Sequence, residues 1–127
     1  MTIKTKRIYE PAADSDGVRI LIDRIWPRGI SRYDARISFW EKDTAPTTEL
    51  RKWFGHKPER WLEFRRRYRA ELRHNPAAKA LRAFVRRQTV TLLYAAHDEE
   101  HNHARVLAAF LRQSPPRRAH TASKKRR

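Results

Sequence analysis

The chain has 127 residues, enough for one domain with its own hydrophobic core, and its 30 Lys and Arg against 14 Asp and Glu give a formal net charge of +16. It contains no cysteine, which excludes disulfides, thiolate zinc sites and cysteine nucleophiles. Its first residues are polar and no apolar run approaches the roughly 20 residues that a membrane helix needs, so we expect a cytoplasmic protein without a signal peptide or a membrane partner.

Alternating residues and turn formers predict short strands in the first third of the chain. Residues 4–9 form the first expected strand, and residues 18–25 form a clearer one because β-branched residues alternate along it. Ser31 with Asp34 three positions later fits the start of a short helix. Residues 37–40 then favour a brief extended segment.

Helical spacing dominates the middle of the chain. Residues 46–54 predict a short helix, with Thr44 as its cap. Residues 58–73 predict a longer helix, because Trp61, Phe64, Tyr68 and Leu72 recur at spacings of three and four and make one apolar face. Residues 77–87 form a third expected helix, which follows an Asn-Pro pair.

The last part of the chain predicts a strand, a helix and a tail. Residues 89–96, TVTLLYAA, are almost continuously apolar, as in a strand buried on both faces of a parallel sheet. Asp98 is expected to cap the final helix, with Glu99 and Glu100 in its first turn. Residues 114–127 lack large apolar side chains and predict a disordered basic tail.

The order of these elements predicts the fold class. Strands, several helices, a strand and a helix indicate an α/β protein, a small single-domain sandwich with a short, largely parallel sheet flanked by helices. We expect this domain to span residues 1–113 and the tail to span 114–127. If the strands at 18–25 and 89–96 are parallel neighbours, their carboxyl ends meet, and residues 23–28 face residues 96–102.

Charged residues gather where the strand at 18–25 ends. The run Val18–Gly29, VRILIDRIWPRG, carries Asp23, Arg24, Trp26 and Arg28 into a turn at Pro27 and Gly29. Arginine forks at such a strand end bind phosphate or carboxylate, and the aspartate could act as a general base. The alternative is structural: an Asp–Arg network pins the loop and the tryptophan packs in the core.

Two further segments hold candidate residues. Thr48 and Arg51 follow Pro46, where free backbone N–H groups could meet an anion, although ordinary helix capping accounts for the same residues. Asn102 and His103 follow the strand at 89–96, and the histidine could transfer a proton near neutral pH or be structural. The histidine spacing here is not H-E-x-x-H, so we expect no metal site.

Basic residues also suggest contact with nucleic acid. Arg66, Arg69 and Arg73 recur at helical spacing, and residues 112–127 hold seven Lys and Arg and no acid, which leaves +9 for residues 1–111. Such surfaces favour non-specific phosphate contacts, since no helix-turn-helix spacing or aromatic interleaving is present. A basic surface of a protein–protein adaptor is a third interpretation. The tail residues expected in the nucleic-acid interface are Lys124, Lys125, Arg126 and Arg127.

Several segments resemble one known family. They are RIY at 7–9, GVRILIDRIWPRG at 17–29, PTTELRKWF at 46–54, FRRRYRAEL at 64–72 and LLYAAHDEEHNHARVL at 92–107. With these segments the chain is identified as a member of the YeaO-like family, small bacterial proteins of unknown function. The resemblance implies an α/β fold and draws attention to the same strand end. It implies no activity and no cofactor, and it does not extend over residues 114–127.

Together these patterns favour a small-ligand-binding or enzymatic domain with an arginine-rich site for a phosphate or carboxylate. Asp23 and His103 are the candidate catalytic residues. The candidate ligand-binding residues are Arg24, Trp26, Arg28, Gly29, Thr48, Arg51 and Asn102. The alternative is a non-enzymatic protein that associates with nucleic acid through its basic helix and tail.

Overall fold

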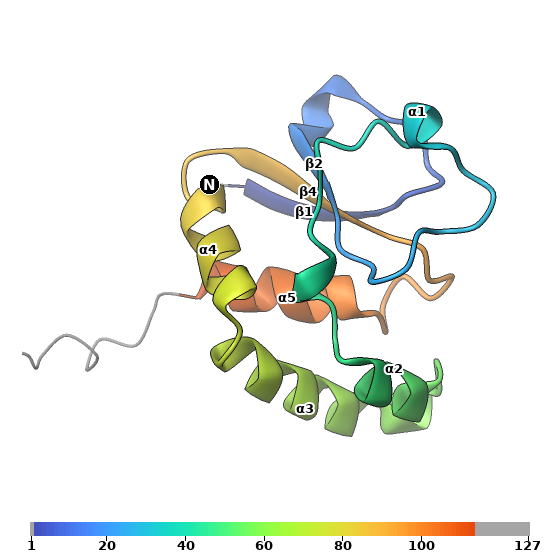
Figure 1. The fold of residues 1–127 in the computed structure, drawn as a ribbon, viewed down its shortest axis with the longest axis vertical. Coiled ribbons are helices and arrows are strands. Elements are labelled where there is room, and N and C mark those ends of the chain that lie inside the picture. Colours follow the sequence, from blue (N-terminus) through green and yellow to red (C-terminus); the bar gives the residue numbers. More distant parts are fainter. Residues whose placement is uncertain (1, 114–127) are drawn as a thin grey trace, which may run out of the picture.

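The structure is a computed structural model that describes residues 2–113, and it is an α/β sandwich (Figure 1). The tail expected at 114–127, with Lys124, Lys125, Arg126 and Arg127, lies outside the described residues. The strands are β1 (Thr2–Arg7), β2 (Val18–Leu21), β3 (Phe39–Trp40) and β4 (Thr89–Tyr94). The helices are α1 (Arg32–Ala35), α2 (Thr48–Phe54), α3 (Trp61–Arg73), α4 (Pro76–Val85) and α5 (His103–Arg112). No helix within residues 2–113 is long and apolar enough to cross a membrane.

The four strands form one parallel sheet in the order β1-β4-β2-β3. Strand β4 lies in its middle, in register with β1 on one side and β2 on the other. Because β2 and β4 are parallel neighbours, their carboxyl ends do meet, as the sequence suggested. Burial of β4 on both faces is also confirmed, since every residue from Val90 to Tyr94 is buried.

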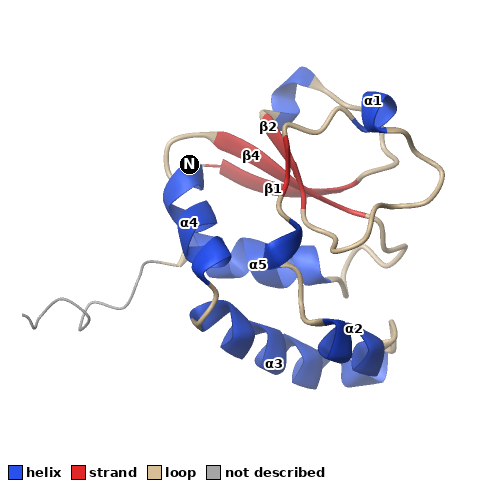
Figure 2. Cartoon of the chain, in the orientation of Figure 1, coloured by secondary structure: helices blue, strands red, loops and turns tan. Residues whose placement is uncertain are grey.

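One face of the sheet carries the larger part of the core. Helix α5 packs on β1 and β4, α3 packs on α5, and α2 and α4 complete this side (Figure 2). Strand alternation directs Ile20, Ile22, Val90, Leu92 and Tyr94 toward these helices. The apolar face of α3 supplies three residues that are almost fully buried, Phe64, Tyr68 and Leu72.

The other face is covered differently. Leu21 and Leu93 point to this side and pack with Ala35 beneath an irregular segment, residues 22–38, in which α1 is the only helix. The buried Arg19 holds this segment in place: its guanidinium donates to the carbonyl of Ala35 and pairs with Asp16 at 2.5 Å. Helices therefore flank chiefly one face of the sheet.

Several of the expected boundaries are wrong. Strand β1 spans Thr2–Arg7 rather than residues 4–9, and β4 ends at Tyr94 rather than at residue 96. Three further differences have a clear physical reason. Strand β2 ends at Leu21, because the chain turns out of the sheet and leaves Ile25 63% exposed. The cap of α2 is Thr47, whose hydroxyl accepts the N–H of Leu50, while Thr44 is buried in a 3-10 turn. Helix α5 begins four residues later than a cap at Asp98 implies, and Asn102 is its N-cap.

Candidate functional site

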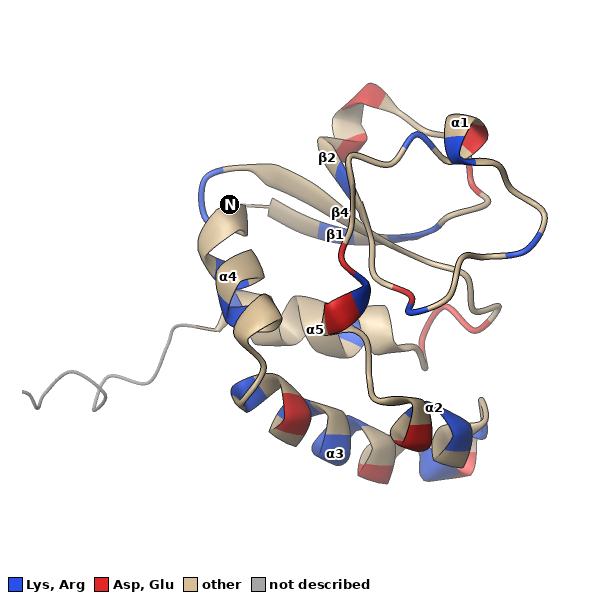
Figure 3. Ribbon diagram, in the orientation of Figure 1, with Lys and Arg blue, Asp and Glu red and all other residues tan. Residues whose placement is uncertain are grey.

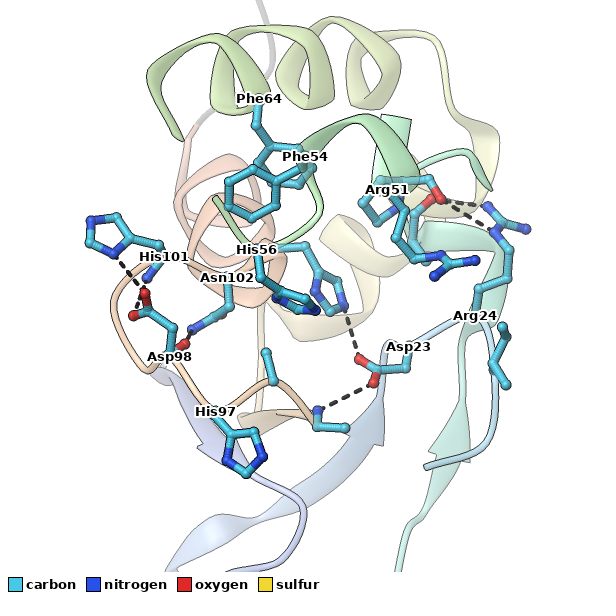
Figure 4. A pocket seen from close by; sticks show the side chains of 16 residues that line it. Asp23, Arg24, Arg51, Phe54, His56, Phe64, His97, Asp98, His101 and Asn102 are labelled. Carbon is cyan, nitrogen blue, oxygen red and sulfur yellow. Dashed lines mark hydrogen bonds and ion pairs between the residues drawn. The ribbon is translucent and has the colours of Figure 1, made fainter. Parts of the chain in front are cut away.

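A cavity of about 550 Å³ opens at the carboxyl ends of β2 and β4 (Figure 4). This is the position at which open α/β sheets bind ligands, and the volume is in the range of small-molecule pockets. Loops after both strands, helix α2, the start of α5 and Phe64 of α3 form its walls. The polar lining residues are Asp23, Arg24, Arg51, His56, His97, Asp98, His101, Asn102 and His103. The apolar ones are Ile25, Ala45, Pro46, Phe54, Phe64, Ala95 and Ala96.

Asp23, in the loop after β2, and His103, the first residue of α5, are in contact at this cavity. Nε2 of His103 lies 3.0 Å from Oδ1 of Asp23 and 3.1 Å from the carbonyl oxygen of Ile22. Only the approach to the carbonyl has the angle of a hydrogen bond, so Oδ1 accepts none from residues 2–113 although it is buried. Both side chains are about one-sixth exposed, at 17% and 16%.

These contacts determine the tautomer of His103. A carbonyl oxygen and a carboxylate oxygen only accept hydrogen bonds, so the nitrogen between them, Nε2, carries the proton. In the neutral ring Nδ1 is then the unprotonated nitrogen, an acceptor or a base. No residue in 2–113 donates a hydrogen bond to it.

The second oxygen of Asp23 joins the carboxylate to the loop after β4. Oδ2 accepts the backbone N–H of Ala95 at 3.2 Å. Arg7, at the end of β1, holds the same loop from the far edge of the sheet by donating to the carbonyls of Ala95 (3.2 Å) and Ala96 (2.9 Å). Arg7 is not among the site residues expected from the sequence, although RIY at 7–9 is one of the segments that carry the resemblance.

Two arginines line the cavity. Nε and Nη2 of Arg24 donate to the carbonyls of Pro46 (3.3 Å) and Ala45 (3.0 Å), which fixes the guanidinium, while Nη1 has no partner among residues 2–113. Arg51, on α2, is exposed, and its guanidinium has no hydrogen-bond or ion-pair partner among residues 2–113. Their positive charge makes this wall the one suited to an anion.

Aromatic rings form the apolar wall. Phe54 and Phe64 stack with their centroids 4.4 Å apart at an interplanar angle of 20°. Behind them Tyr68 is completely buried, and its hydroxyl donates to the carbonyl of Thr44 at 2.6 Å. Burial raises the pKa of Tyr68 well above its usual value of 10.0, so the residue stays a donor. The helical spacing of apolar residues predicts Phe64 and Tyr68 as core residues, and both are buried. Phe64, on the same face of α3, also lines the cavity.

The remaining wall holds Asp98 and three histidines. Oδ1 of Asp98 accepts the backbone N–H groups of His101 and Glu100, and Oδ2 lies 2.9 Å from Nδ1 of His101. These hydrogen bonds, with the backbone bond from His101 the strongest cause, lower the pKa of Asp98 to about 2. His56 and His97 are exposed there. No group of three His, Asp or Glu within residues 2–113 is placed to hold a metal ion.

Four candidate residues lie away from the cavity. Trp26 packs on Trp40 at 5.4 Å and donates to the carbonyl of Ile30 at 2.8 Å, as its structural interpretation expected. Arg28 and Gly29 are exposed in the loop beyond it and are not among the lining residues, nor is Thr48. The turn at Pro27 and Gly29 thus carries the second arginine of the motif away from the first.

Asn102 lines the cavity but uses its side chain for the fold. Its Oδ1 caps α5 by accepting the N–H of Arg105 at 3.2 Å, and its Nδ2 donates to the carbonyl of Asp98 at 2.9 Å. The side chain is buried and both polar ends are occupied. Asn102 therefore positions His103, the next residue, at the cavity.

The arginines of α3 lie elsewhere on the surface. Figure 3 shows acidic positions between the basic ones along this helix. Glu63 binds Arg66 at 2.7 Å and Arg67 at 2.8 Å, which lowers the pKa of Glu63 to about 2. Arg69 is half-buried and Arg73 is exposed at the end of the helix. Nothing in these contacts selects a partner.

Comparisons with known proteins place the chain in a family. The family model DUF488-N3i, described as the inactive DUF488-N3 subclade, matches residues 2–126. The uncharacterized protein YeaO of Escherichia coli (strain K12) is 47% identical over 113 residues, which cover 88% of this chain and 98% of YeaO. The uncharacterized protein Rv3073c of Mycobacterium tuberculosis (strain ATCC 25618 / H37Rv) is 44% identical over 109 residues, 86% of this chain and 92% of that relative. No solved structure gives a significant match.

Proposed function

The chain belongs to the YeaO-like family, within the inactive DUF488-N3 subclade, and from that premise we propose that its cavity binds a small organic anion without transforming it. The anion is a phosphate or a carboxylate, held by Arg24 and Arg51. The observation that carries the proposal is the cavity itself, which combines these two arginines with an apolar wall at the carboxyl ends of β2 and β4.

The two guanidinium groups have complementary parts in this proposal. Arg24 is held by two backbone carbonyls, so it presents its free N–H groups in one fixed direction at little entropic cost. Arg51 is exposed and its guanidinium is without a partner in residues 2–113, so it can close on the anion after the anion has entered. A planar fork of this kind can donate two parallel hydrogen bonds to one phosphate or carboxylate.

Binding without turnover fits the roles of the remaining polar groups. The description of the subclade as inactive supports it. Asp23 is tied by Oδ2 to Ala95 and His103 by Nε2 to the carbonyl of Ile22, so both side chains are fixed parts of the wall. In this proposal they contact the ligand, and no proton transfer is assigned to them.

The test is calorimetric titration of the full chain with phenyl phosphate, with phenol as the uncharged match. We expect phenyl phosphate to bind, and Arg51→Gln to weaken it about ten-fold, since a hydrogen bond to a charged group contributes about 1.5–3 kcal/mol. Arg28→Gln is the matched control: it removes the same charge from an exposed arginine of the neighbouring loop that does not line the cavity. Equal losses in both variants, or no preference for phenyl phosphate over phenol, would refute the proposal.

A further inference from the structure

We propose that the end of the sheet at which the strands begin binds single-stranded nucleic acid, with phosphates on arginines that follow α4 and a base against Phe84. All four strands are parallel, so this surface lies at the end opposite to the cavity. The inference therefore does not depend on the proposed function. It also moves the basic contacts to α4, whereas the sequence predicts them on α3 and the tail.

Residues 72–97 contain no acidic side chain. Figure 3 shows no acidic position on α4 or on the turn that leads from α4 into β4. On α3, in contrast, Glu63 pairs with two of the arginines. A phosphate chain would therefore meet uncompensated positive charge at α4 and compensated charge at α3. The charged side chains of residues 72–97 are Arg73, Lys79, Arg82, Arg86 and Arg87.

Three exposed arginines meet where β1 and β4 begin. Arg86 and Arg87 lie in the turn between α4 and β4, and neither guanidinium has a partner among residues 2–113. Arg112, at the end of α5, reaches the same end of the sheet, because its Nη2 donates to the carbonyl of Ile3 in β1 at 2.6 Å. Within residues 2–113 none of the three forms an ion pair with an acid. Their charge is therefore available to an anion from outside.

A fourth arginine adds to this positive charge. Arg82 lies one helical turn before Arg86 and is half-buried, with its guanidinium 4.1 Å from the ring centroid of Phe110. Its Nη2 donates to the carbonyl of Phe110 at 3.3 Å. Burial, and to a smaller extent the charge of Arg86, lowers the pKa of Arg82 from its ordinary value. A phosphate bound at Arg86 would offset the repulsion between these two cations.

A groove of about 300 Å³ lies beside these arginines, between α4 and the edge strand β3. Phe84 and Phe39 both line it, in edge-to-face contact with centroids 5.6 Å apart. Both rings stay partly exposed, at 38% and 47%. The remaining lining residues are apolar except Glu41, which follows β3 and so lies at the end of the groove away from Arg86 and Arg87.

This combination of charge and exposed rings fits a single strand better than a duplex. The bases of a duplex are stacked on one another, whereas a single strand can turn one base onto an aromatic side chain. Phe84 stands two residues before Arg86, so a base against its ring brings the adjoining phosphates to Arg86 and Arg87. Stacking of this kind accepts every base, and we expect binding without a sequence preference.

The first test is fluorescence anisotropy of the full chain with a labelled oligothymidylate of about 20 nucleotides, over a series of salt concentrations. We expect Arg86→Gln/Arg87→Gln to reduce the slope of log K against log salt by about 1.4, because each phosphate contact on a single strand contributes about 0.7. Arg66→Gln/Arg67→Gln is the matched control, since it removes the same charge from arginines that pair with Glu63. It should leave the slope unchanged. Equal slopes in the two double variants, or no binding at about 50 mM salt, would overturn the proposal.

The second test concerns the base. Phe84→Leu keeps an apolar side chain in the groove and removes the ring, so it should weaken binding of the oligothymidylate about ten-fold. Binding of a duplex with the same number of phosphates should not change. Tyr33→Leu is the control, because it removes a ring that is 82% exposed on α1. An equal effect of both variants, or an equal loss for single strand and duplex in Phe84→Leu, would refute the contact with a base.

Discussion

Replacing Gly17 by alanine tests how the sheet is held together at the start of β2. Gly17 has φ 65° and ψ −137°, a conformation in which residues with a side chain are strained by about 1–3 kcal/mol. A Cβ there would lie 2.8 Å from the carbonyl carbon of Thr89 and closer still to its oxygen. Because that oxygen is backbone at the start of the central strand β4, it cannot move aside as a side chain would. Overpacking of this kind costs about 1–3 kcal/mol more.

We therefore expect Gly17→Ala to lower the free energy of unfolding by about 2–6 kcal/mol, a large part of the 5–15 kcal/mol of a typical domain. Urea unfolding followed by circular dichroism measures it. Gly29→Ala is the matched control, since Gly29 also has a positive φ, 79°, but nothing lies within 4 Å of its Cβ position. It should cost about 1–2 kcal/mol. Two variants that agree within about 0.5 kcal/mol would show that the close approach to Thr89 is unimportant.

Three other substitutions test contacts described above. Tyr68→Phe should lower the free energy of unfolding in urea by about 1–2 kcal/mol, because it removes a buried hydrogen bond and leaves the carbonyl of Thr44 without its donor. An unchanged free energy of unfolding would contradict this. Asn102→Ala should lower the free energy of unfolding by about 1 kcal/mol, because it removes the cap of α5, whereas Asp98→Ala should leave the helix content seen by circular dichroism unchanged. A loss of helix content in Asp98→Ala, without a loss of stability in Asn102→Ala, would instead support the cap at Asp98 that the sequence predicts. Burial alone would raise the pKa of Asp16, but hydrogen bonds from Ala13, Lys6 and Arg19 hold it below the ordinary 3.8. Its ionised form thus stabilises the fold above that pH and ceases to do so as the pH falls through the lowered pKa. The difference in free energy of unfolding between wild type and Asp16→Asn should be largest at neutral pH and should disappear in acid. A difference that does not depend on pH would contradict the ion network.

Patterns with a single physical cause were predictable from the sequence. The apolar run at β4 has only one good environment, the middle of a parallel sheet, and the structure places it there. Helix spacing placed Phe64 and Tyr68 on a buried face. The start of α5 was harder to predict, because two residues that can cap a helix, Asp98 and Asn102, lie four positions apart. Asp98 forms a turn of its own, and Asn102 caps α5.

The site was predictable only in part. The adjacency of β2 and β4 brings Asp23 and His103 together, and both were candidates from the sequence. The direction of the chain after Arg24 could not be read from residue types, since Arg28 is equally suited to an anion. Which arginine faces the cavity depends on where Trp26 packs, and that is a tertiary contact with Trp40. The role of Arg7 likewise depends on strand order, because it reaches Ala95 and Ala96 from β1, the neighbour of β4.

The unequal covering of the sheet has a consequence for hydrogen exchange. Residues 22–38 rest on a small cluster and on the buried Arg19, whereas the opposite face is under two layers of helix. Such a segment can open as a unit at a lower free energy than global unfolding. Opening would separate Asp23 from Ala95 and so dismantle one wall of the cavity while the helical core stays closed. Slower amide exchange in residues 26–38, none of which lines the cavity, with a ligand bound would then report occupancy of the cavity from the other face of the sheet.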